Sequence, residues 1–562
     1  MINFRKHLAW LCSASLWCGT AAWAQEPAPF PAATEASNDF DVAKRFEQLQ
    51  QRLDRLEAEN GQLRQSMLQS HGEFNNGVTP ANAEMWNADT ACPPACQCPV
   101  CAAAKDGKGD WKTGWNNGIE WVSPDKAFKV HIGGRTQLDF VGLDAESGAL
   151  AGAGGGSGFP AGVGTGSPNH DDDAVVFRRA RLRADGTIYE TIEYVVEYDF
   201  VNSLRVDAPT STANTANIPA PTDAYWTFKE IPWFGNFRVG LQKEAIGFEH
   251  LTSSRFLNFM ERSYLQDLFT GPNNNGFSPG LSLFNNYDGD RGLWAIGAFK
   301  NTNTSNPFAF GLGNGTYSMT GRLTYLLIDD KECNQLLHVG ASGSMRDPDG
   351  NLIRFRTRSL RNGPGNLATV YGDTGTFNAD KQYLAGVELV GVSGSWNFQS
   401  EWIGSWSTDT SNFTPPAGFP GGGTNAAGAV GTRHGTYMSQ GGYCEVQYFL
   451  TGEVREYDRK AAAFGRVTPK RNARWKGGCW EPGAWQAGFR YGFADLNDNG
   501  IQGGYLNEYT VGLNWFLNPN MKVQWNYVLT QRNFDKVIAP EAGAHVNDGL
   551  IHGFGMRLAH DF

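Results

Sequence analysis

An alternation of apolar and polar side chains with a period of two residues constrains this chain more than any other feature. It begins near residue 119 and recurs to the last residue. One clear stretch carries apolar side chains at every second position, namely Met521, Val523, Trp525, Tyr527 and Leu529. This period is typical of β-strands with one apolar and one polar face, so it predicts an all-β fold for this part of the chain.

The composition favours a membrane-embedded barrel over a soluble β-protein. The 562 residues include 71 aromatic side chains (35 Phe, 18 Trp and 18 Tyr) and 69 glycines, while only 19% of the residues are charged. Soluble sandwiches and propellers hide their apolar faces against each other, whereas a membrane barrel faces lipid with half of each strand. Strands that cross a bilayer must close into a barrel, because an open edge would leave backbone polar groups in lipid.

The first residues have the pattern of an export signal. Arg5 and Lys6 precede an apolar stretch that ends in the small-x-small sequence AWA at 22–24, which predicts a signal peptide over residues 1–24. Residues 25–37 are rich in Pro and Ala and are interpreted as a linker.

The next segment, residues 38–70, has the spacing of a short coiled coil. Its apolar seam follows alternating steps of four and three residues, with one polar member: Val42, Phe46, Leu49, Leu53, Leu56, Asn60, Leu63 and Met67. Such a heptad pattern predicts self-association of helices. A single amphipathic helix packed on another domain is the alternative.

A linker with Cys and Pro is predicted over residues 71–118. It contains a cluster of four cysteines, Cys92, Cys96, Cys98 and Cys101. The spacing lacks the paired CxxC pattern of zinc sites, so in an exported protein it favours disulfides within or between chains, with zinc as the alternative. We predict no metal ion and no other cofactor.

Residues 119–562 are predicted to form a transmembrane antiparallel β-barrel of sixteen strands. Tight and long connections alternate along it, and an even number of strands leaves both ends of the barrel sequence on the periplasmic side. Residues 452–482 are too long for a periplasmic turn. This basic segment could instead hold two strands, which would give eighteen, and it could fold into the lumen or extend from the barrel.

The first predicted hairpin has its turn at Asp185-Gly186-Thr187, a common length in which Gly supplies a positive φ. In this register Arg179 lies opposite Glu193. The arginine face of the hairpin then consists of Arg179, Arg181, Arg183, Glu193 and Glu197. The opposite, apolar face consists of Val176, Ala180, Leu182, Ile188, Ile192, Tyr194 and Val196.

Two sets of arginines recur with strand spacing and are candidates for a solute pathway. The first set is Arg179, Arg181 and Arg183, and the second, in a long loop, is Arg354, Arg356 and Arg358. A period of two places each set on one side of an extended segment, where its guanidinium groups could pass an anion from one to the next. Pairing with Glu193 and Glu197 is the structural alternative for the first set. A solvated loop face is the alternative for the second, whose nearest acids in sequence are Asp349 and Asp373.

Five segments resemble, in order, the phosphate-selective porin O and P family. They are FRRARLRADGTI (177–188), LTSSRFLNFMER (251–262), GYCEVQYFLTGEVREYDRKAAAFGRVTP (442–469), FRYGFADLNDNGIQGG (489–504) and YTVGLNWFLNPNMKVQWNYV (509–528). The resemblance extends from about residue 120 to the C-terminus.

The resemblance implies a trimeric barrel of sixteen strands, in which the third loop folds inward and an arginine ladder conducts anions. The ladder positions that it implies are Arg135, Arg179, Arg181, Arg354, Arg356 and Arg358. Within the implied third loop, Arg255 and Arg262 are candidates near the constriction. Lys243 precedes this loop, and no lysine occurs in 244–290.

We therefore predict an outer-membrane porin, without enzymatic activity, for passive diffusion of small anions such as phosphate or polyphosphate. Its expected partners are small anions, outer-membrane lipid and two further copies of the chain. The net charge of −10 argues against nucleic acid. The alternative is a barrel that mainly anchors a periplasmic coiled coil in contact with the cell wall.

Overall fold

The structure is a computed structural model that describes residues 110–145, 170–201, 219–271, 276–300, 316–358, 360, 371–413, 430–533 and 549–562. The predicted signal peptide (1–24), linker (25–37), coiled coil (38–70) and cysteine cluster (92–101) lie outside the described residues. The predictions for these segments stay predictions.

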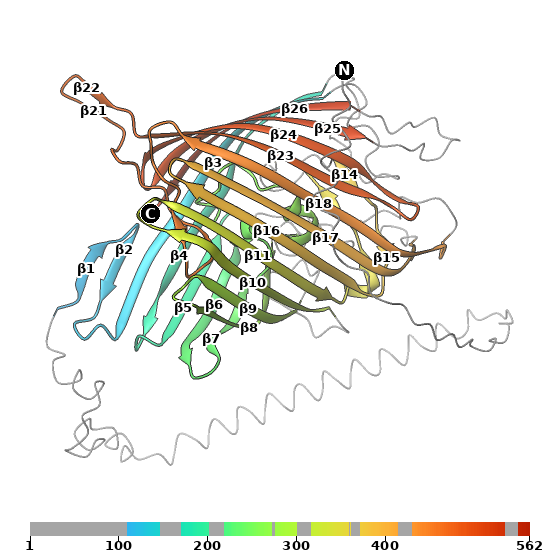
Figure 1. Ribbon diagram of the computed structural model, residues 1–562, viewed down its shortest axis with the longest axis horizontal. Helices are drawn as coiled ribbons and strands as arrows, with labels where there is room; N and C mark the ends of the chain where they lie inside the picture. Colours follow the sequence, from blue (N-terminus) through green and yellow to red (C-terminus); the bar gives the residue numbers. More distant parts are fainter. Residues whose placement is uncertain are drawn as a thin grey trace, which may run out of the picture. The chain divides into compact units, whose positions relative to one another are not determined.

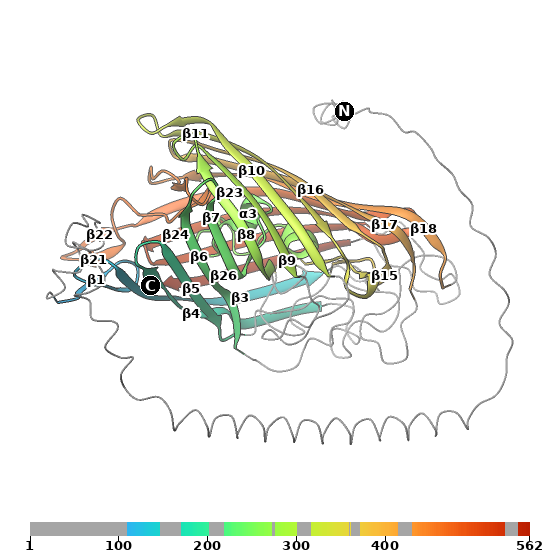
Figure 2. The same ribbon diagram turned by 90° about the horizontal axis from the view of Figure 1, so that it is seen from below.

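Sixteen antiparallel strands close into a barrel (Figures 1 and 2). They are β3 (Phe128–Ala145), β4 (His170–Ile188), β5 (Ile192–Asp199), β6 (Ala220–Ile231), β7 (Gly235–Lys243), β8 (Phe277–Tyr287), β9 (Gly292–Lys300), β10 (Tyr317–Asp330), β11 (Gln335–Arg346), β16 (Gln382–Ser393), β17 (Trp396–Asn412), β18 (Arg433–Phe449), β23 (Ala484–Asp498), β24 (Ile501–Asn518), β25 (Met521–Asn533) and β26 (Gly549–Asp561). The barrel closes because β26 pairs with β3 from Ile551 opposite Ala145 to Asp561 opposite Arg135. A short hairpin, β1 (Lys112–Trp115) and β2 (Ile119–Val122), pairs with the start of β3.

The connections define two ends of the barrel. At one, here called the turn end, the links are short, such as 189–191, 331–334 and 519–520. The long links lie at the other, the loop end, and include loop 3 (residues 244–276) and loop 5 (347–381). Among the described residues, no helix is long and apolar enough to span a bilayer.

The long turn, residues 450–483, adds no strand to the wall, so the prediction of sixteen strands is confirmed and the alternative of eighteen is wrong. Its hairpins, β19 (Tyr457–Asp458) with β20 (Ala463–Phe464) and β21 (Arg474–Lys476) with β22 (Cys479–Glu481), form separate two-stranded sheets. Meanwhile β18 pairs directly with β23, from Gln440 opposite Asp495 to Phe449 opposite Gln486.

The first hairpin is longer than predicted. Strand β4 runs on to Ile188, which lies opposite Ile192, so the turn is 189–191 rather than Asp185-Gly186-Thr187. Gly186 is needed inside the strand, because a Cβ there would lie 1.9 Å from the carbonyl oxygen of Lys129. The predicted arginine face is correct, but the predicted pairing of Arg179 with Glu193 is wrong: Glu193 lies opposite Thr187, and Glu197 lies opposite Arg183.

A β-bulge at Arg178 also breaks the predicted alternation. Gln137 lies opposite Arg179 and the next residue, Leu138, opposite Phe177, so Arg178 is the extra residue. Both arginines are buried toward the lumen, whereas Phe177 is 53% exposed on the outer face. Val176 is consequently on the lumen face, not on the outer face with Ala180 and Leu182 as predicted.

Three segments fold into the lumen. Loop 3 carries the short helix α3 (Phe248–Leu251) and the π-helical turn η3 (Gln266–Thr270), and loop 5 carries η5 (Asp349–Asn351), β12 (Leu352–Ile353), β13 (Arg356–Thr357), β14 (Gly372–Asp373) and β15 (Phe377–Asn378). Residues of both loops share an apolar core with inward residues of β16–β18, β23, β24 and β26. The first part of the long turn enters from the turn end and packs on Phe248 of α3 through Phe464, with ring centroids 5.0 Å apart. One side of the lumen is therefore filled.

Candidate functional site

A cavity of about 350 Å³ lies on the other side of the lumen, between loop 3 and the wall formed by β3, β4 and β6–β9. We call it the arginine cavity. Nine cationic residues line it: Arg135, Arg179, Arg181, Arg183, Arg238, Lys243, Arg255, Arg262 and Lys460. Asp223 is the one carboxylate among the described lining residues. The lining is thus strongly cationic in a chain whose net charge is −10.

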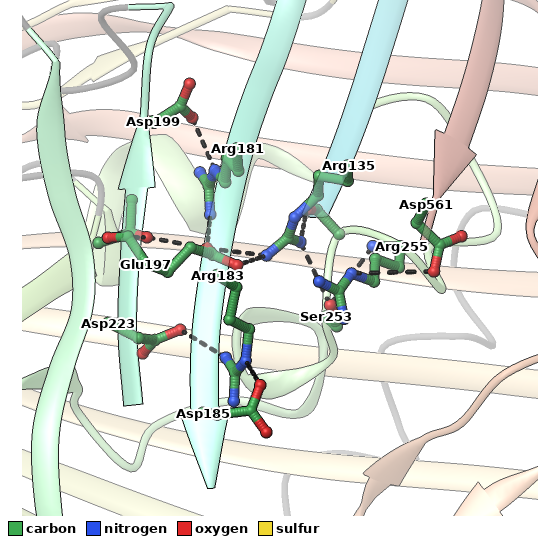
Figure 3. A network of polar contacts seen from close by, with 12 residues as sticks. Arg135, Arg181, Arg183, Asp185, Glu197, Asp199, Asp223, Ser253, Arg255 and Asp561 are labelled. Carbon is green, nitrogen blue, oxygen red and sulfur yellow. Dashed lines mark hydrogen bonds and ion pairs between the residues drawn. The ribbon is translucent and has the colours of Figure 1, made fainter. Parts of the chain in front are cut away.

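The wall arginines are oriented by carboxylates that lie behind them (Figure 3). Glu197 is fully buried and accepts hydrogen bonds from Nη2 of Arg135 at 2.6 and 2.8 Å and from Nη1 of Arg181 at 2.8 Å. Nε of Arg181 donates to Asp199 at 2.6 Å, and Nε of Arg183 donates to Asp185 at 2.8 Å. These three acids do not line the cavity, whereas Asp223, 3.8 Å from Nη1 of Arg183, does, so the guanidinium groups of the wall meet the cavity with one carboxylate beside them.

Two wall cations have no close carboxylate in the described part of the barrel. Nη1 of Arg179 donates to the neutral side chain of Gln137 at 2.7 Å. The guanidinium of Arg238 lies between the rings of Tyr225 and Phe284, with its carbon 4.1 and 4.7 Å from the two centroids. Cation–π contacts orient a charge without neutralising it.

The two loop 3 cations that line the cavity, Arg255 and Arg262, have no short carboxylate contact among the described residues. Arg262 donates to the carbonyl oxygens of Glu249 and Thr252 at 2.9 and 2.7 Å. Nε of Arg255 lies 3.9 Å from Asp561, and this nitrogen and Nη2 have no hydrogen-bond acceptor among the described residues. Burial lowers the pKa of both guanidinium groups below their usual value, which reflects the cost of placing a positive charge away from water. An anion in the cavity would offset that cost.

His250 lines the same cavity as a neutral group. It is 3% exposed, and its Nδ1 lies 3.0 Å from Oε1 of Gln266. Burial, followed by the charges of Lys243 and Arg262, lowers its pKa well below the usual value. It is therefore a polar lining group rather than a cation at neutral pH.

Loop 5 places the second arginine set in different surroundings. Arg354 donates to both carboxylate oxygens of Asp373, at 2.9 and 2.7 Å, and Arg356 donates to the same carboxylate at 3.0 Å. Arg358 is 2% exposed and lies 3.4 Å from Asp267 of loop 3. None of the three arginines lines the arginine cavity. Burial would raise the pKa of Asp373, but Arg354 and Arg356 lower it to about 2.

The comparisons with known proteins agree with this architecture. A family model described as phosphate-selective porin O and P matches residues 162–551, well over half of the chain. The chain belongs to this porin family.

Individual relatives of the porin are distant. An uncharacterized protein of Caulobacter vibrioides is 26% identical over 78% of both chains, and porin O of Pseudomonas aeruginosa is 24% identical over 77% of this chain and 89% of its own. Among solved structures, the anion-selective porin from Comamonas acidovorans has a TM-score of 0.42 and 10% identity over 77% of this chain and 100% of that chain. As a member of the family, the protein is an outer-membrane porin.

Loop 3 of the porin is fastened to the wall by a network that the sequence analysis missed. Glu261 accepts hydrogen bonds from Arg178 at 2.8 and 3.2 Å and from Arg557 at 2.6 Å, and Arg557 also forms two 2.6 Å bonds with Asp139. Burial would raise the pKa of Glu261, but Arg178 and Arg557 hold it well below its usual value. Without the bulge at Arg178, regular alternation would turn this arginine toward lipid, so period-two counting could not reveal it.

The long turn contributes one end of the arginine cavity, a role that the sequence left open. Lys460 and Ala461 line the cavity at the tip of the β19–β20 hairpin. The wall holds this tip in place, because Nη2 of Arg322 donates to the carbonyl of Ala462 at 3.0 Å and His338 hydrogen-bonds the hydroxyl of Tyr457 at 2.7 Å. The first part of the basic segment therefore folds into the lumen, whereas the β21–β22 hairpin extends beyond the barrel wall (Figure 1).

Proposed function

We propose that this porin passes small anions, phosphate among them, through the arginine cavity. The observation that carries the proposal is the lining of nine cationic residues and one carboxylate among the described residues. Selectivity in a pore follows the charge that lines it at close range, rather than the net charge of the chain. The name of the family, which refers to phosphate, supports this substrate class.

The proposed pathway keeps six arginines from the sequence analysis and adds three further cations of the cavity. The six are Arg135, Arg179, Arg181, Arg183, Arg255 and Arg262, and the three are Arg238, Lys243 and Lys460. Guanidinium groups have a planar fork of donors that matches the oxygens of phosphate and carboxylate ions. The buried carboxylates Glu197 and Asp199 hold two of the forks in fixed directions. An anion would exchange its water for these donors in steps, with no covalent chemistry and no energy input.

A role in the pathway for Arg354, Arg356 and Arg358 stays a prediction. Their ion pairs with Asp373 and Asp267 favour a structural role, in which they hold loop 5 inside the barrel and against loop 3. Selectivity measurements on variants of this set decide between the two roles, as described below.

Recordings from the purified porin in planar bilayers test the proposal. In a potassium chloride gradient, the reversal potential should show preference for chloride, and added phosphate should reduce the chloride current if it binds along the same path. Cation preference in the wild-type protein would contradict the anion pathway. If the protein prefers anions but phosphate does not reduce the chloride current, the anion pathway is supported and phosphate is not a ligand of it.

Arg255 offers a matched pair of variants, because the carboxylate within ion-pair distance of it in the described residues, Asp561, is 3.9 Å away, so a substitution breaks no short ion pair there. Arg255→Gln should lower the anion preference, whereas Arg255→Lys keeps the charge and should retain most of it. Equal anion preference in the two variants would show that the charge of Arg255 does not act on the permeating ion.

The predicted homotrimer and the cell-wall contact through residues 38–70 also stay predictions. Mass spectrometry of the intact porin in detergent would test the first. Deletion of residues 38–70 would test the second: lost envelope attachment with unchanged conductance would favour the anchoring function.

A further inference from the structure

The β21–β22 hairpin carries two exposed tryptophans on one face. Trp475 lies opposite Trp480, and the two strands are joined by Gly477 and Gly478, both with positive φ. Paired residues on adjacent antiparallel strands point to the same side of the sheet. The two residues are 75% and 55% exposed, so the two indoles form an apolar surface that no described part of the barrel covers.

The barrel does not need this hairpin for its own closure. Strands β21 and β22 form a separate two-stranded sheet, and β18 and β23 pair with each other directly. An isolated hairpin is only marginally stable in water, and exposed indoles add an unfavourable apolar surface. The arrangement therefore indicates a partner that covers the two rings.

The base of the hairpin joins the outer aromatic belt at the turn end. Trp485 and Trp515 both donate from Nε1 to the carbonyl oxygen of Pro482, the residue after β22, at 3.2 and 2.6 Å. Trp485 also stacks on Trp515 and Trp525, with centroids 5.2 and 6.2 Å apart. Aromatic belts mark the depth of the lipid headgroups in outer-membrane barrels. The hairpin thus leaves the wall at headgroup level.

The positive charge of the hairpin and of the residues just before it complements lipid phosphate. Lys470, Arg471 and Arg474 are exposed, and the nearby acid Glu481 pairs with Arg474 at 2.7 Å. An excess of cations beside exposed tryptophans is the pattern of membrane-surface segments, in which indoles enter the interface and cations meet phosphates.

We propose that the β21–β22 hairpin docks on the anionic phospholipid surface at the turn end of the barrel. Trp475 and Trp480 enter the interfacial layer, and Lys470 and Arg471 contact the phosphates. The hairpin would then act as a lateral anchor that holds the base of the long turn, whose other part lines the arginine cavity. This inference concerns the outer surface of the barrel and is independent of the anion pathway.

A fluorophore at Cys479, which is exposed in β22, tests the docking. The full-length porin, with every other cysteine replaced by serine, is labelled with nitrobenzoxadiazole and placed in nanodiscs of phosphatidylethanolamine and phosphatidylglycerol. We expect a blue-shifted emission, quenching by lipids with a nitroxide near the headgroup, and several-fold weaker quenching by iodide than in detergent. An emission and iodide response equal to those in detergent would overturn the proposal, as would burial of the label only after a periplasmic protein extract is added.

Two variants separate the proposed contributions. Trp475→Thr/Trp480→Thr keeps residues that favour strands but removes both indoles. The emission and iodide quenching of the label should then be those of a fluorophore exposed to water. In the protein with both cations the label should respond more strongly in nanodiscs with phosphatidylglycerol than in nanodiscs without it, and Lys470→Gln/Arg471→Gln should remove this difference. A full response in both variants would overturn the proposal. A separate protein labelled only at the lipid-facing Cys444 of β18 provides the control, because its fluorescence should not change with either variant.

Discussion

The two sets of arginines have the same spacing in sequence but different surroundings in the barrel. Arg179, Arg181 and Arg183 lie on the wall strand β4 and line the arginine cavity. Arg354, Arg356 and Arg358 lie in loop 5, where Asp373 and Asp267 are their acidic partners. In the wall set the acids that bind Arg181 and Arg183 at short distance, Glu197, Asp199 and Asp185, do not line the cavity, whereas in the loop set Asp373 accepts hydrogen bonds from two arginines.

This difference shows what alternation can and cannot predict. A period of two places residues on one side of an extended segment, but it does not say whether that side meets water or another part of the chain. A buried ion pair that loses one member leaves an uncompensated charge, whereas a cation that lines a pore acts on whatever ion passes. Substitutions in the loop set should therefore change mainly stability, and substitutions in the wall set should change mainly ion selectivity.

The largest effect is expected from removing Arg354 and Arg356, two arginine partners of Asp373. Arg354→Gln/Arg356→Gln leaves this 2%-exposed carboxylate without its arginines, and the loss of a buried pair costs about 3–5 kcal/mol. Thermal unfolding in detergent and limited proteolysis of loop 5 would measure it. Arg433→Gln, at an exposed arginine of β18, is the control. Wild-type stability in the double variant would show that loop 5 does not depend on these pairs.

Acid should weaken loop 5 in a defined range of pH. The folded pKa of Asp373 is about 2, below the usual 3.8, so its contribution is fully present above pH 3.8 and is lost as the pH falls through 2. The size of the loss is about 2 kcal/mol, because one pKa unit corresponds to about 1.4 kcal/mol. Proteolysis of loop 5 between pH 5 and pH 2, followed over time, would measure it. If Asp373→Asn shows the same acid response as the wild type, another group is responsible.

Within the wall set, Arg179 gives the cleanest test of selectivity, because its hydrogen-bond partner Gln137 is neutral. Arg179→Gln should reduce the anion-to-cation permeability ratio by about tenfold or more, since one charge about 10 Å from the ion path shifts the energy of an anion by on the order of 1.5 kcal/mol at an effective dielectric constant of about 20, and that of a cation by the same amount in the opposite direction. Reversal potentials would measure the ratio, with Arg179→Lys as the charge-preserving control. A drop of similar size in the Arg354→Gln/Arg356→Gln variant would end the distinction between the two sets.

The smallest effect is expected at His250, which occupies the same cavity without a charge. Its pKa lies well below the usual value because of burial and of the neighbouring cations Lys243 and Arg262. His250→Gln should therefore leave the permeability ratio within about twofold of the wild type at neutral pH, because no charge is removed. A larger loss of anion preference would mean that His250 carries a proton in the open pore.

Much of the wall could be predicted from the sequence, and less of the lumen. The alternation gave sixteen strands and the correct side for Arg181 and Arg183, since both depend on local pattern. The turn after β4 was misplaced because Gly186 is required by the close approach of Lys129 rather than by a turn. Arg178 was missed because a bulge inverts the alternation.

The acid partners of loop 5 show a further limit of sequence reasoning. Asp373 was recognised as one of the nearest acids, but its position between Arg354 and Arg356 depends on the pairing of β13 with β14. That pairing forms inside the barrel, where loops from distant parts of the chain meet. Contacts of this kind depend on tertiary packing, which a single sequence pattern does not encode.

Because part of the lumen is filled, the diameter of this barrel does not determine the width of its open passage. Sixteen strands can enclose a broad aqueous channel. Here loop 3, loop 5 and the long turn fill the side of the lumen that faces β10–β26, and the arginine cavity lies against β3, β4 and β6–β9. If solutes pass through that cavity, as proposed above, substitutions along β16–β25 would change the stability of the barrel without changing which solutes permeate. Permeation could then diverge among related proteins while the number of strands stays the same.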